Sequence, residues 1–270
     1  MKTITPKGTL VPIGGGMAGE DILERICHET HKRKPLVCYI TVATADRDEV
    51  KEMQRNFAKD IQAHVEFIQF DLRSEADSEE NLDKIRSCNC VFIGGGNQLR
   101  LTSLLGGTKL MELITQRYIE EPRFIVAGSS AGAAAMSNTM VVAGSSKDAL
   151  IKGDLHLTNG LDLINNVFID THFTERGRFG RLIQAVTYNP GVLGLGLSLN
   201  TGAVITKGER MEIVGCGLAV VVDGMEIDYS NLTEVSDGDP LTVQGLKMHV
   251  LGPGSAFSIK NRKLMDLVRS

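Results

Sequence analysis

Short apolar segments rich in Val, Ile and Phe alternate with longer amphipathic segments along most of the chain. The apolar segments read TLVPI, LVCYITVA, VEFIQF, CVFIGGG, RFIVAG, NVFID and VLGLGLSL. Helix-like stretches such as EDILERICHETHKR and DEVKEMQRNFAKDIQAH separate several of them. Apolar strands that alternate with helices belong to a parallel sheet with helices on both faces. The pattern therefore predicts an α/β fold, a three-layer sandwich around a mostly parallel sheet.

The pattern changes from about Thr201 onward. The stretches AVITKGERMEIVG, LAVVVDGMEI and LKMHVLGPGSAFSI combine strand propensity with glycine turns, and no helix-like segment lies between them. We therefore expect C-terminal antiparallel hairpins appended to the parallel sheet. No internal repeat, low-complexity tract or linker interrupts the chain, so residues 1–270 are expected to form a single domain.

Composition excludes several partner classes. The chain carries 29 Lys and Arg against 33 Asp and Glu, with no long block of one sign, which argues against nucleic acid or an anionic membrane as the main partner. The N-terminal stretch MKTITPKGTLVPIGGG has no apolar signal-peptide core, and no segment is apolar enough to span a bilayer. We expect a soluble cytoplasmic protein.

The cysteines do not predict a disulfide framework, because the chain has five of them at irregular spacing and no secretory signal. The stretch CHETH brings Cys27, His28 and His31 together, but no fourth metal ligand is visible nearby. A partly solvated helix face is the favoured interpretation, and no metal site is predicted.

The first glycine-rich turn, GGGMAG, formally fits the G-x-G-x-x-G pattern of dinucleotide-binding proteins through Gly14, Gly16 and Gly19. An acidic residue should end the second strand about 20 residues further on. The nearest candidate, Asp46, lies beyond that point and follows TVATA. A structural turn that lets two backbones approach closely is therefore favoured over nucleotide binding.

A second glycine-flanked turn, GSSAG, places Ser130 at the centre of a G-x-S-x-G motif. An apolar strand (FIVA) precedes it and a run of small residues (AGAAAMS) follows it, which is the context of a nucleophile elbow. The backbone N–H of Ala131 would then face a developing oxyanion. We expect Ser130 to be a nucleophile, whereas Ser129 lacks a glycine on both sides at the required spacing.

A serine nucleophile needs a base within hydrogen-bond reach, and His172 is the strongest candidate among six histidines. It follows an apolar strand in NVFIDTHFTERGRFGRL, two residues after Asp170. The two residues are two apart on an extended segment, so we expect both side chains to point to the same face. Three arginines follow, with guanidinium groups suited to carboxylates: Arg176, Arg178 and Arg181.

These segments together resemble cyanophycinase and its wider family of serine peptidases, which includes aspartyl dipeptidase. The resemblance rests on GGG..GED, IGGGNQLRLTSLL, GSSAGAAAMS and IDTHFTERGRFGRL in this order. It implies a fold like that of class I glutamine amidotransferases, usually a homodimer, with Ser130 as nucleophile and His172 as general base. It also implies a peptide substrate, hydrolysis of an arginine-bearing aspartate polymer to β-Asp-Arg dipeptides, and no metal or organic cofactor.

The resemblance assigns further residues to the site. The loop at Gly95 and Gly96 would help to complete the oxyanion hole. Asn97 stands where the family has Asp, a change that keeps hydrogen bonding and loses a charge. The residues implied to hold the substrate are Asn97, Gln98, Asp170, Arg176, Arg178 and Arg181.

The segment GLSLNTGA departs from the family pattern, which reads like GIDE.TA. Leu199 stands where the family has the glutamate that orients the histidine. Loss of such a carboxylate lowers the turnover of a serine protease about 10⁴-fold. Three interpretations stay open: another acid replaces it (Asp170, Glu175 or Asp223), Ser198 or a backbone carbonyl orients the ring, or the pocket binds substrate without turning it over.

Overall fold

The computed structural model describes residues 5–16, 19–144 and 150–265. Its largest sheet has nine strands in the order β17-β16-β11-β10-β1-β5-β4-β2-β3. Strands β1, β5, β4, β2 and β3 run parallel to one another. The remaining four strands, β10, β11, β16 and β17, pair antiparallel with their neighbours. These strands are β1 (Thr9–Ile13), β2 (Leu36–Ile40), β3 (His64–Ile68), β4 (Cys90–Ile93), β5 (Ile125–Ser129), β10 (Thr201–Thr206), β11 (Arg210–Gly215), β16 (Ala256–Ser258) and β17 (Lys263–Leu264).

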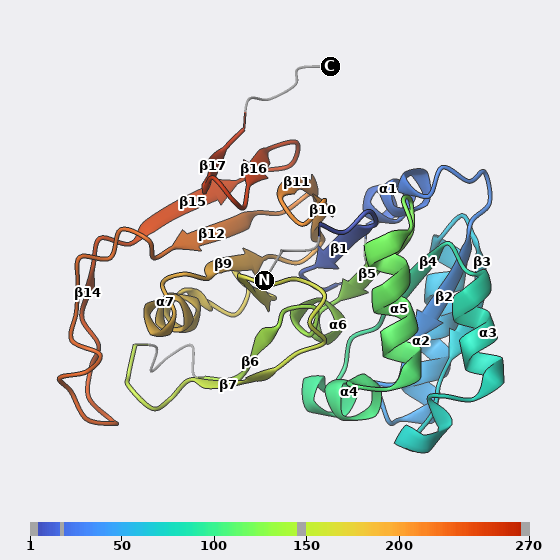
Figure 1. Ribbon diagram of the computed structural model, residues 1–270, viewed down its shortest axis with the longest axis horizontal. Helices are drawn as coiled ribbons and strands as arrows, with labels where there is room; N and C mark the ends of the chain where they lie inside the picture. The colour runs from blue at the N-terminus through green and yellow to red at the C-terminus, as the bar shows by residue number, and fades with distance from the viewer. Residues whose placement is uncertain (1–4, 17–18, 145–149, 266–270) are drawn as a thin grey trace.

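Helices cover both faces of the large sheet (Figure 1). They are α1 (Glu20–Glu29), α2 (Arg47–Asp60), α3 (Glu79–Ser87), α4 (Gln98–Leu105), α5 (Lys109–Glu120) and the short α6 (Ala131–Ala134), with the 3-10 turn η1 (Arg73–Glu75) before α3. Helix α7 (Phe179–Tyr188) instead packs on the strands of a second sheet.

Two hydrophobic clusters lie on opposite faces of the parallel strands. On one face, Val37 and Phe92 pack with apolar residues of α1 and α2. On the other face, Cys38 and Ile93 pack with apolar residues of α3, α4 and α5. Successive residues of each strand thus belong to different clusters, as strand geometry requires. This arrangement confirms the predicted α/β fold with helices on both sides.

A second sheet of four strands lies beside the first, in the order β15-β12-β9-β8. Its strands are β8 (Val167–Thr171), β9 (Leu193–Leu197), β12 (Ala219–Asp223) and β15 (Lys247–Leu251). Strands β8 and β9 are parallel, and β12 pairs antiparallel with both β9 and β15. Two small hairpins complete the fold: β6 (Thr139–Ala143) with β7 (His156–Asn159), and β13 (Tyr229–Ser230) with β14 (Val243–Gln244).

The existence of two sheets corrects one expectation from the sequence. The segments after Thr201 were expected to extend a single sheet, yet only β10, β11, β16 and β17 do so. Strands β12 and β15 instead join β9 in the second sheet (Figure 1). Helix α6 packs against both β5 and β8, so β8 lies across this helix from the large sheet and pairs with β9 in the second sheet.

Within the part of the chain that the structure describes, no helix has the length and apolar character needed to cross a bilayer.

Candidate active site

The turn after β5 carries Ser130 at the C-terminal edge of the large sheet. Ser130 has φ 52° and ψ −113° and directly precedes α6. Such a positive φ costs a non-glycine residue about 1–3 kcal/mol and is typical of functional sites. The flanking glycines are needed for space: a Cβ on Gly128 would lie 2.9 Å from the carbonyl carbon of Gly132, and one on Gly132 would lie 2.2 Å from the carbonyl oxygen of Ile93. The motif therefore forms a strand–turn–helix elbow.

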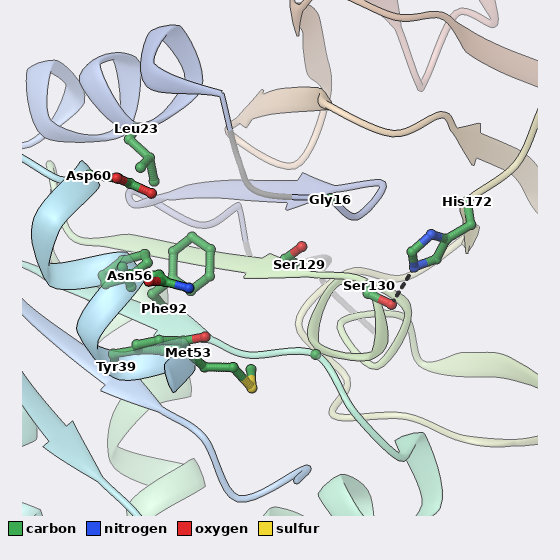
Figure 2. Close-up of a pocket in the computed structure, with 12 residues that line it drawn as sticks. Gly16, Leu23, Tyr39, Met53, Asn56, Asp60, Phe92, Ser129, Ser130 and His172 are labelled. Carbon is green, nitrogen blue, oxygen red and sulfur yellow. Dashed lines mark hydrogen bonds between the residues drawn. The ribbon is translucent and has the colours of Figure 1, made fainter. Parts of the chain in front are cut away.

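His172 lies beside Ser130, although the two come from different sheets. The Ser130 Oγ and His172 Nε2 atoms are 2.8 Å apart and share a hydrogen bond (Figure 2). His172 follows β8 with φ 49°, and its backbone N–H donates to the carbonyl of Gly14 at 2.7 Å. Because β8 ends at Thr171, the expectation that Asp170 and His172 point to one strand face was wrong.

The first glycine turn holds the imidazole in place. A Cβ on Gly15, which has φ 118°, would lie 2.5 Å from His172 Cε1, and one on Gly14 would lie 2.1 Å from the carbonyl oxygen of Ser198. The close backbone approach expected for this turn is therefore present, and its purpose is to admit the histidine ring. Asp46 accepts hydrogen bonds from two backbone N–H groups as the N-cap of α2. Residues 17 and 18 of GGGMAG lie outside the described residues.

The surroundings of His172 favour its neutral form. Burial lowers the pKa of His172 from its usual value of 6.5, and the charges of Arg176 and Arg178 lower it further. The carboxylates of Glu175 and Asp170 act in the opposite direction and offset only part of this effect. A neutral imidazole can accept a proton from a hydroxyl group, so this environment suits a general base near neutral pH.

Three backbone N–H groups in the loops next to Ser130 have no hydrogen-bond partner among the described residues. They belong to Gly95, Gly96 and Ala131. The neighbouring Gly94 and Asn97 N–H groups, in contrast, donate to the carbonyls of Ile40 and Ala43. A Cβ on Gly95 would be 3.4 Å from Ser130 Cβ, so this loop lies directly beside the nucleophile. Unpaired N–H groups next to a serine are the donors that an oxyanion hole needs.

The two polar residues after this loop have partners within the chain. Asn97 is the N-cap of α4 and accepts a hydrogen bond from the Arg100 N–H at 2.9 Å. Aspartate and asparagine cap helices about equally well, which explains why the family's Asp can be Asn here. The Gln98 side chain donates to the Val141 carbonyl at 3.3 Å. A direct role of either residue in substrate binding stays a prediction.

Asp170 and two of the three arginines form a buried ion network under the site. Asp170 is 1% exposed, and the Arg181 guanidinium donates to both of its carboxylate oxygens. Arg178 donates to Asp170 at 3.0 Å and to the Thr171 carbonyl at 2.7 Å. The network fixes the end of β8 from which His172 projects. Substrate contacts by these three residues remain predictions.

Arg176 differs from the other two arginines. It is exposed, and its guanidinium makes no hydrogen bond or ion pair with the described side chains. Because it also influences the pKa of His172, its charge acts at the active site. Arg176 is thus the arginine of this segment without an ion-pair partner among the described residues, and its contact with a substrate stays a prediction.

Glu175, from a neighbouring turn, hydrogen-bonds to the backbone of Leu199. Glu175 Oε1 accepts hydrogen bonds from the Leu199 backbone N–H at 3.2 Å and from Thr174 Oγ1 at 3.0 Å. Its Oε2 accepts none from the residues that the structure describes. The Ser198 hydroxyl lies 2.8 Å from Thr174 Oγ1 and can donate to it. Glu175 therefore brings a carboxylate to the backbone of Leu199.

The other two candidate acids are engaged elsewhere. Asp170 is bound by Arg178 and Arg181, and Asp223 in β12 is bound by Arg262. Within the described ranges, no carboxylate makes a hydrogen bond to the ring of His172. Glu175 is one of the three acids that the sequence offers as a replacement for the glutamate. The local sequence could not select it, because its contact with Leu199 joins two separate loops.

Comparison with known proteins gives a consistent result. The family model described as "Peptidase family S51" matches residues 10–214. A protein named cyanophycinase from Geminocystis herdmanii is 30% identical over 263 residues, which cover 96% of each chain. Another cyanophycinase, from Trichormus variabilis, is 35% identical over 204 residues, covering 76% of this chain and 68% of its own length.

A solved structure supports the fold. The crystal structure of a peptidase from an acI-B1 Actinobacterium superposes with a TM-score of 0.70 over 95% of this chain and 98% of its own. Its sequence identity is 18%, so this likeness concerns the architecture alone.

Proposed function

The chain belongs to Peptidase family S51, and on that premise we propose that it is a serine-type exopeptidase of the cyanophycinase type. Its substrate is cyanophycin, multi-L-arginyl-poly-L-aspartate, or a related isoaspartyl peptide, and its products are β-Asp-Arg dipeptides. The observation that carries the proposal is the 2.8 Å hydrogen bond between Ser130 Oγ and His172 Nε2 at a nucleophile elbow. The relatives named cyanophycinase support the choice of substrate.

The proposed reaction proceeds through an acyl-enzyme. Ser130 Oγ attacks the scissile carbonyl carbon while His172 Nε2 takes the hydroxyl proton. The N–H groups of Ala131 and Gly95 donate to the oxyanion that forms. As the intermediate collapses, the C–N bond breaks and His172 returns the proton to the leaving amine. Water, deprotonated by the same histidine, then attacks the ester and releases the acid.

We assign the orienting role of the missing glutamate to Glu175. Its Oε2 atom is free of hydrogen bonds to the described residues, while Oε1 is fixed by the Leu199 N–H and by Thr174 Oγ1. The negative charge of Glu175 raises the pKa of His172 against the other influences. A carboxylate so placed can accept the second ring proton and stabilise the imidazolium as it forms. Neither Asp170 nor Asp223 has this freedom.

Incubation of the purified protein with cyanophycin, followed by chromatography of the released dipeptides, tests this function. The wild type is expected to release β-Asp-Arg, and Ser130→Ala is expected to release none. An unchanged rate in Ser130→Ala would remove Ser130 from the mechanism. Ser129→Ala is the matched control, because it deletes the neighbouring hydroxyl, for which the structure gives no bond to His172.

A second candidate function is substrate binding without turnover. The observation in its favour is that, among the described residues, His172 has no hydrogen bond to a carboxylate. Calorimetry with a β-Asp-Arg ligand beside the activity assay separates the two functions: binding with no dipeptide release by the wild type supports the second.

The family resemblance also leads us to propose a homodimer that works in the cytoplasm. Exposed apolar side chains on the outer strand β15 of the second sheet, Met248 and Val250, support a surface that another copy covers. Sedimentation velocity of the wild type and of Val250→Asp tests this assembly, with a dimer expected for the first and a monomer for the second.

A further inference from the structure

A cavity of about 260 Å³ opens beside Ser130 on the side of the large sheet that α1 and α2 cover. Ser129 lies between Leu23 and Asp60 on one side and the Ser130–His172 pair on the other (Figure 2), and Gly95 also lines the cavity. Sites that enclose a whole drug-sized ligand measure about 300–1,000 Å³. This cavity is therefore suited to one side chain of a longer substrate.

The walls of the cavity are aromatic and rigid. Tyr39 of β2, Phe57 of α2 and Phe92 of β4 pack together, with ring centroids 4.4 Å (Tyr39–Phe57), 4.6 Å (Phe57–Phe92) and 5.4 Å (Tyr39–Phe92) apart. All three side chains are buried. Leu23 of α1 and Met53 of α2 add aliphatic surface. Such walls bind an apolar stem, and aromatic faces also attract cations.

One wall of the cavity also carries polar groups, Asn56 and Asp60. Helix α2 lines it with Met53, Asn56, Phe57 and Asp60, whose spacing of three, four and seven residues places them on one helix face. Neither Asn56 nor Asp60 makes a side-chain hydrogen bond or ion pair with the residues that the structure describes. The half-buried Asp60 carboxylate lies next to Leu23, on the same side of the pocket as Asn56 and away from Ser130 and His172 (Figure 2).

Asp60 is also poorly placed for the stability of its own helix. It is the last residue of α2, where the partial negative charge of the helix C-terminus disfavours an acid by a few tenths to 1 kcal/mol. Asp46 at the other end of α2, in contrast, caps the helix. An unpaired acid at a helix C-terminus, turned toward a cavity, is better explained by a ligand than by folding.

We propose that this cavity is a specificity subsite that binds an arginine-like side chain of the substrate's acyl part. The apolar stem of that side chain contacts Tyr39, Phe57 and Phe92, and its guanidinium group pairs with Asp60 and with the amide oxygen of Asn56. A guanidinium fits here because it is planar, stacks on aromatic faces and presents several donors in a fork.

The position of the cavity selects the acyl part. Because His172 returns the proton to the leaving amine, the leaving group lies on the histidine side of Ser130. His172 borders the cavity, but the wall from Ser129 to Asp60 lies on the opposite side of Ser130 from the histidine (Figure 2). This inference rests on the proposed serine peptidase function. It adds that the cavity beside Ser130 binds the arginine side chain of the acyl part.

The test compares two substrates: a three-unit β-aspartyl-arginine oligomer and the same oligomer with citrulline, a neutral isostere, in place of arginine. For the wild type we expect kcat/KM to be about tenfold or more higher with arginine, as for loss of one charge-assisted hydrogen bond. Asp60→Asn is expected to lower this ratio about tenfold. Glu52→Gln, an exposed acid of the same helix outside the cavity lining, is expected to leave the ratio unchanged.

The outcomes distinguish the subsite from the proposed function. An arginine-to-citrulline ratio that Asp60→Asn does not change, in a turning-over enzyme, overturns the subsite alone. If the wild type hydrolyses neither oligomer, the peptidase function fails, and calorimetry of the same two oligomers on the wild type and Asp60→Asn decides the subsite. Equal affinity for both oligomers would overturn it. A lysine-bearing oligomer shows whether an ammonium group is accepted equally well, which would contradict the guanidinium assignment.

Discussion

A methyl group at Gly15 tests whether the position of the His172 ring controls the reaction. A Cβ at this glycine would lie 2.5 Å from His172 Cε1 and 2.7 Å from Nε2. Non-bonded carbon atoms make their best contact at about 3.5–4.0 Å, so the ring must move by about 1 Å. Nε2 is the atom that lies 2.8 Å from Ser130 Oγ. A shift of this size carries the pair beyond hydrogen-bond range.

The expected cost follows from this displacement. A misplacement of about 1 Å in a catalytic group lowers the rate about 10²-fold, which corresponds to about 2.7 kcal/mol in the activation free energy. Gly15→Ala is therefore expected to lower kcat for the β-aspartyl-arginine oligomer about hundredfold. The loss should be in kcat rather than in KM, because the aromatic residues of the proposed arginine subsite, Tyr39 and Phe92, lie on the opposite side of Ser130 from His172 (Figure 2).

The control must separate ring displacement from backbone strain, since Gly15 has φ 118°. Gly238 has φ 96°, and nothing lies within 4 Å of the Cβ that alanine would add there. Gly238→Ala thus introduces comparable strain without the contact to the imidazole. We expect thermal unfolding to show a similar loss of stability in both variants, and kcat to fall only in Gly15→Ala. A Gly15→Ala enzyme that keeps kcat within about threefold of the wild type would refute this reasoning.

Three further predictions concern the charges around the base. Arg176→Gln removes a charge that lowers the pKa of His172, so the acid limb of the pH profile of kcat/KM should move to higher pH. Glu175→Gln removes a charge that raises this pKa, so the same limb should move to lower pH. Acid limbs that do not move would contradict the charge assignment. Glu175→Gln should also lower kcat, and adding Leu199→Glu to it should restore part of the loss; no recovery would show that residue 199 cannot orient the ring. Arg181→Met leaves its buried carboxylate partner with one guanidinium, so the urea-unfolding free energy should fall by about 3 kcal/mol, against less than about 1 kcal/mol for an exposed arginine.

Much of the fold could be predicted from local patterns. The segment TLVPI coincides with β1, Thr9–Ile13, because each of its residues is buried and the strand is short. The G-x-S-x-G motif indicated the elbow, since the crowding around Gly128 and Gly132 leaves no room for side chains there. Such features depend on a few neighbouring residues, so the sequence contains nearly all the information that they need.

Features that join distant segments could not be predicted in this way. His172 leaves the extended conformation at φ 49° because its N–H binds Gly14, and no property of NVFID announces this contact. The separation into two sheets places β8 across α6 from β5. The spacing of Asn56 and Asp60 on one face of α2 was visible in the sequence, but polar residues on a helix are ordinarily solvated. Only the folded chain shows that this face borders a cavity.

The proposed peptidase function depends most directly on the activation of Ser130 by His172. Reaction with a fluorophosphonate, which modifies activated serines, followed by mass spectrometry of the digested protein, measures this activation without any assumption about the substrate. We predict one modified site, Ser130, with a labelling rate at least about 10³-fold lower in His172→Ala. Labelling at another serine, no labelling of the wild type, or a rate that His172→Ala leaves unchanged would contradict the account.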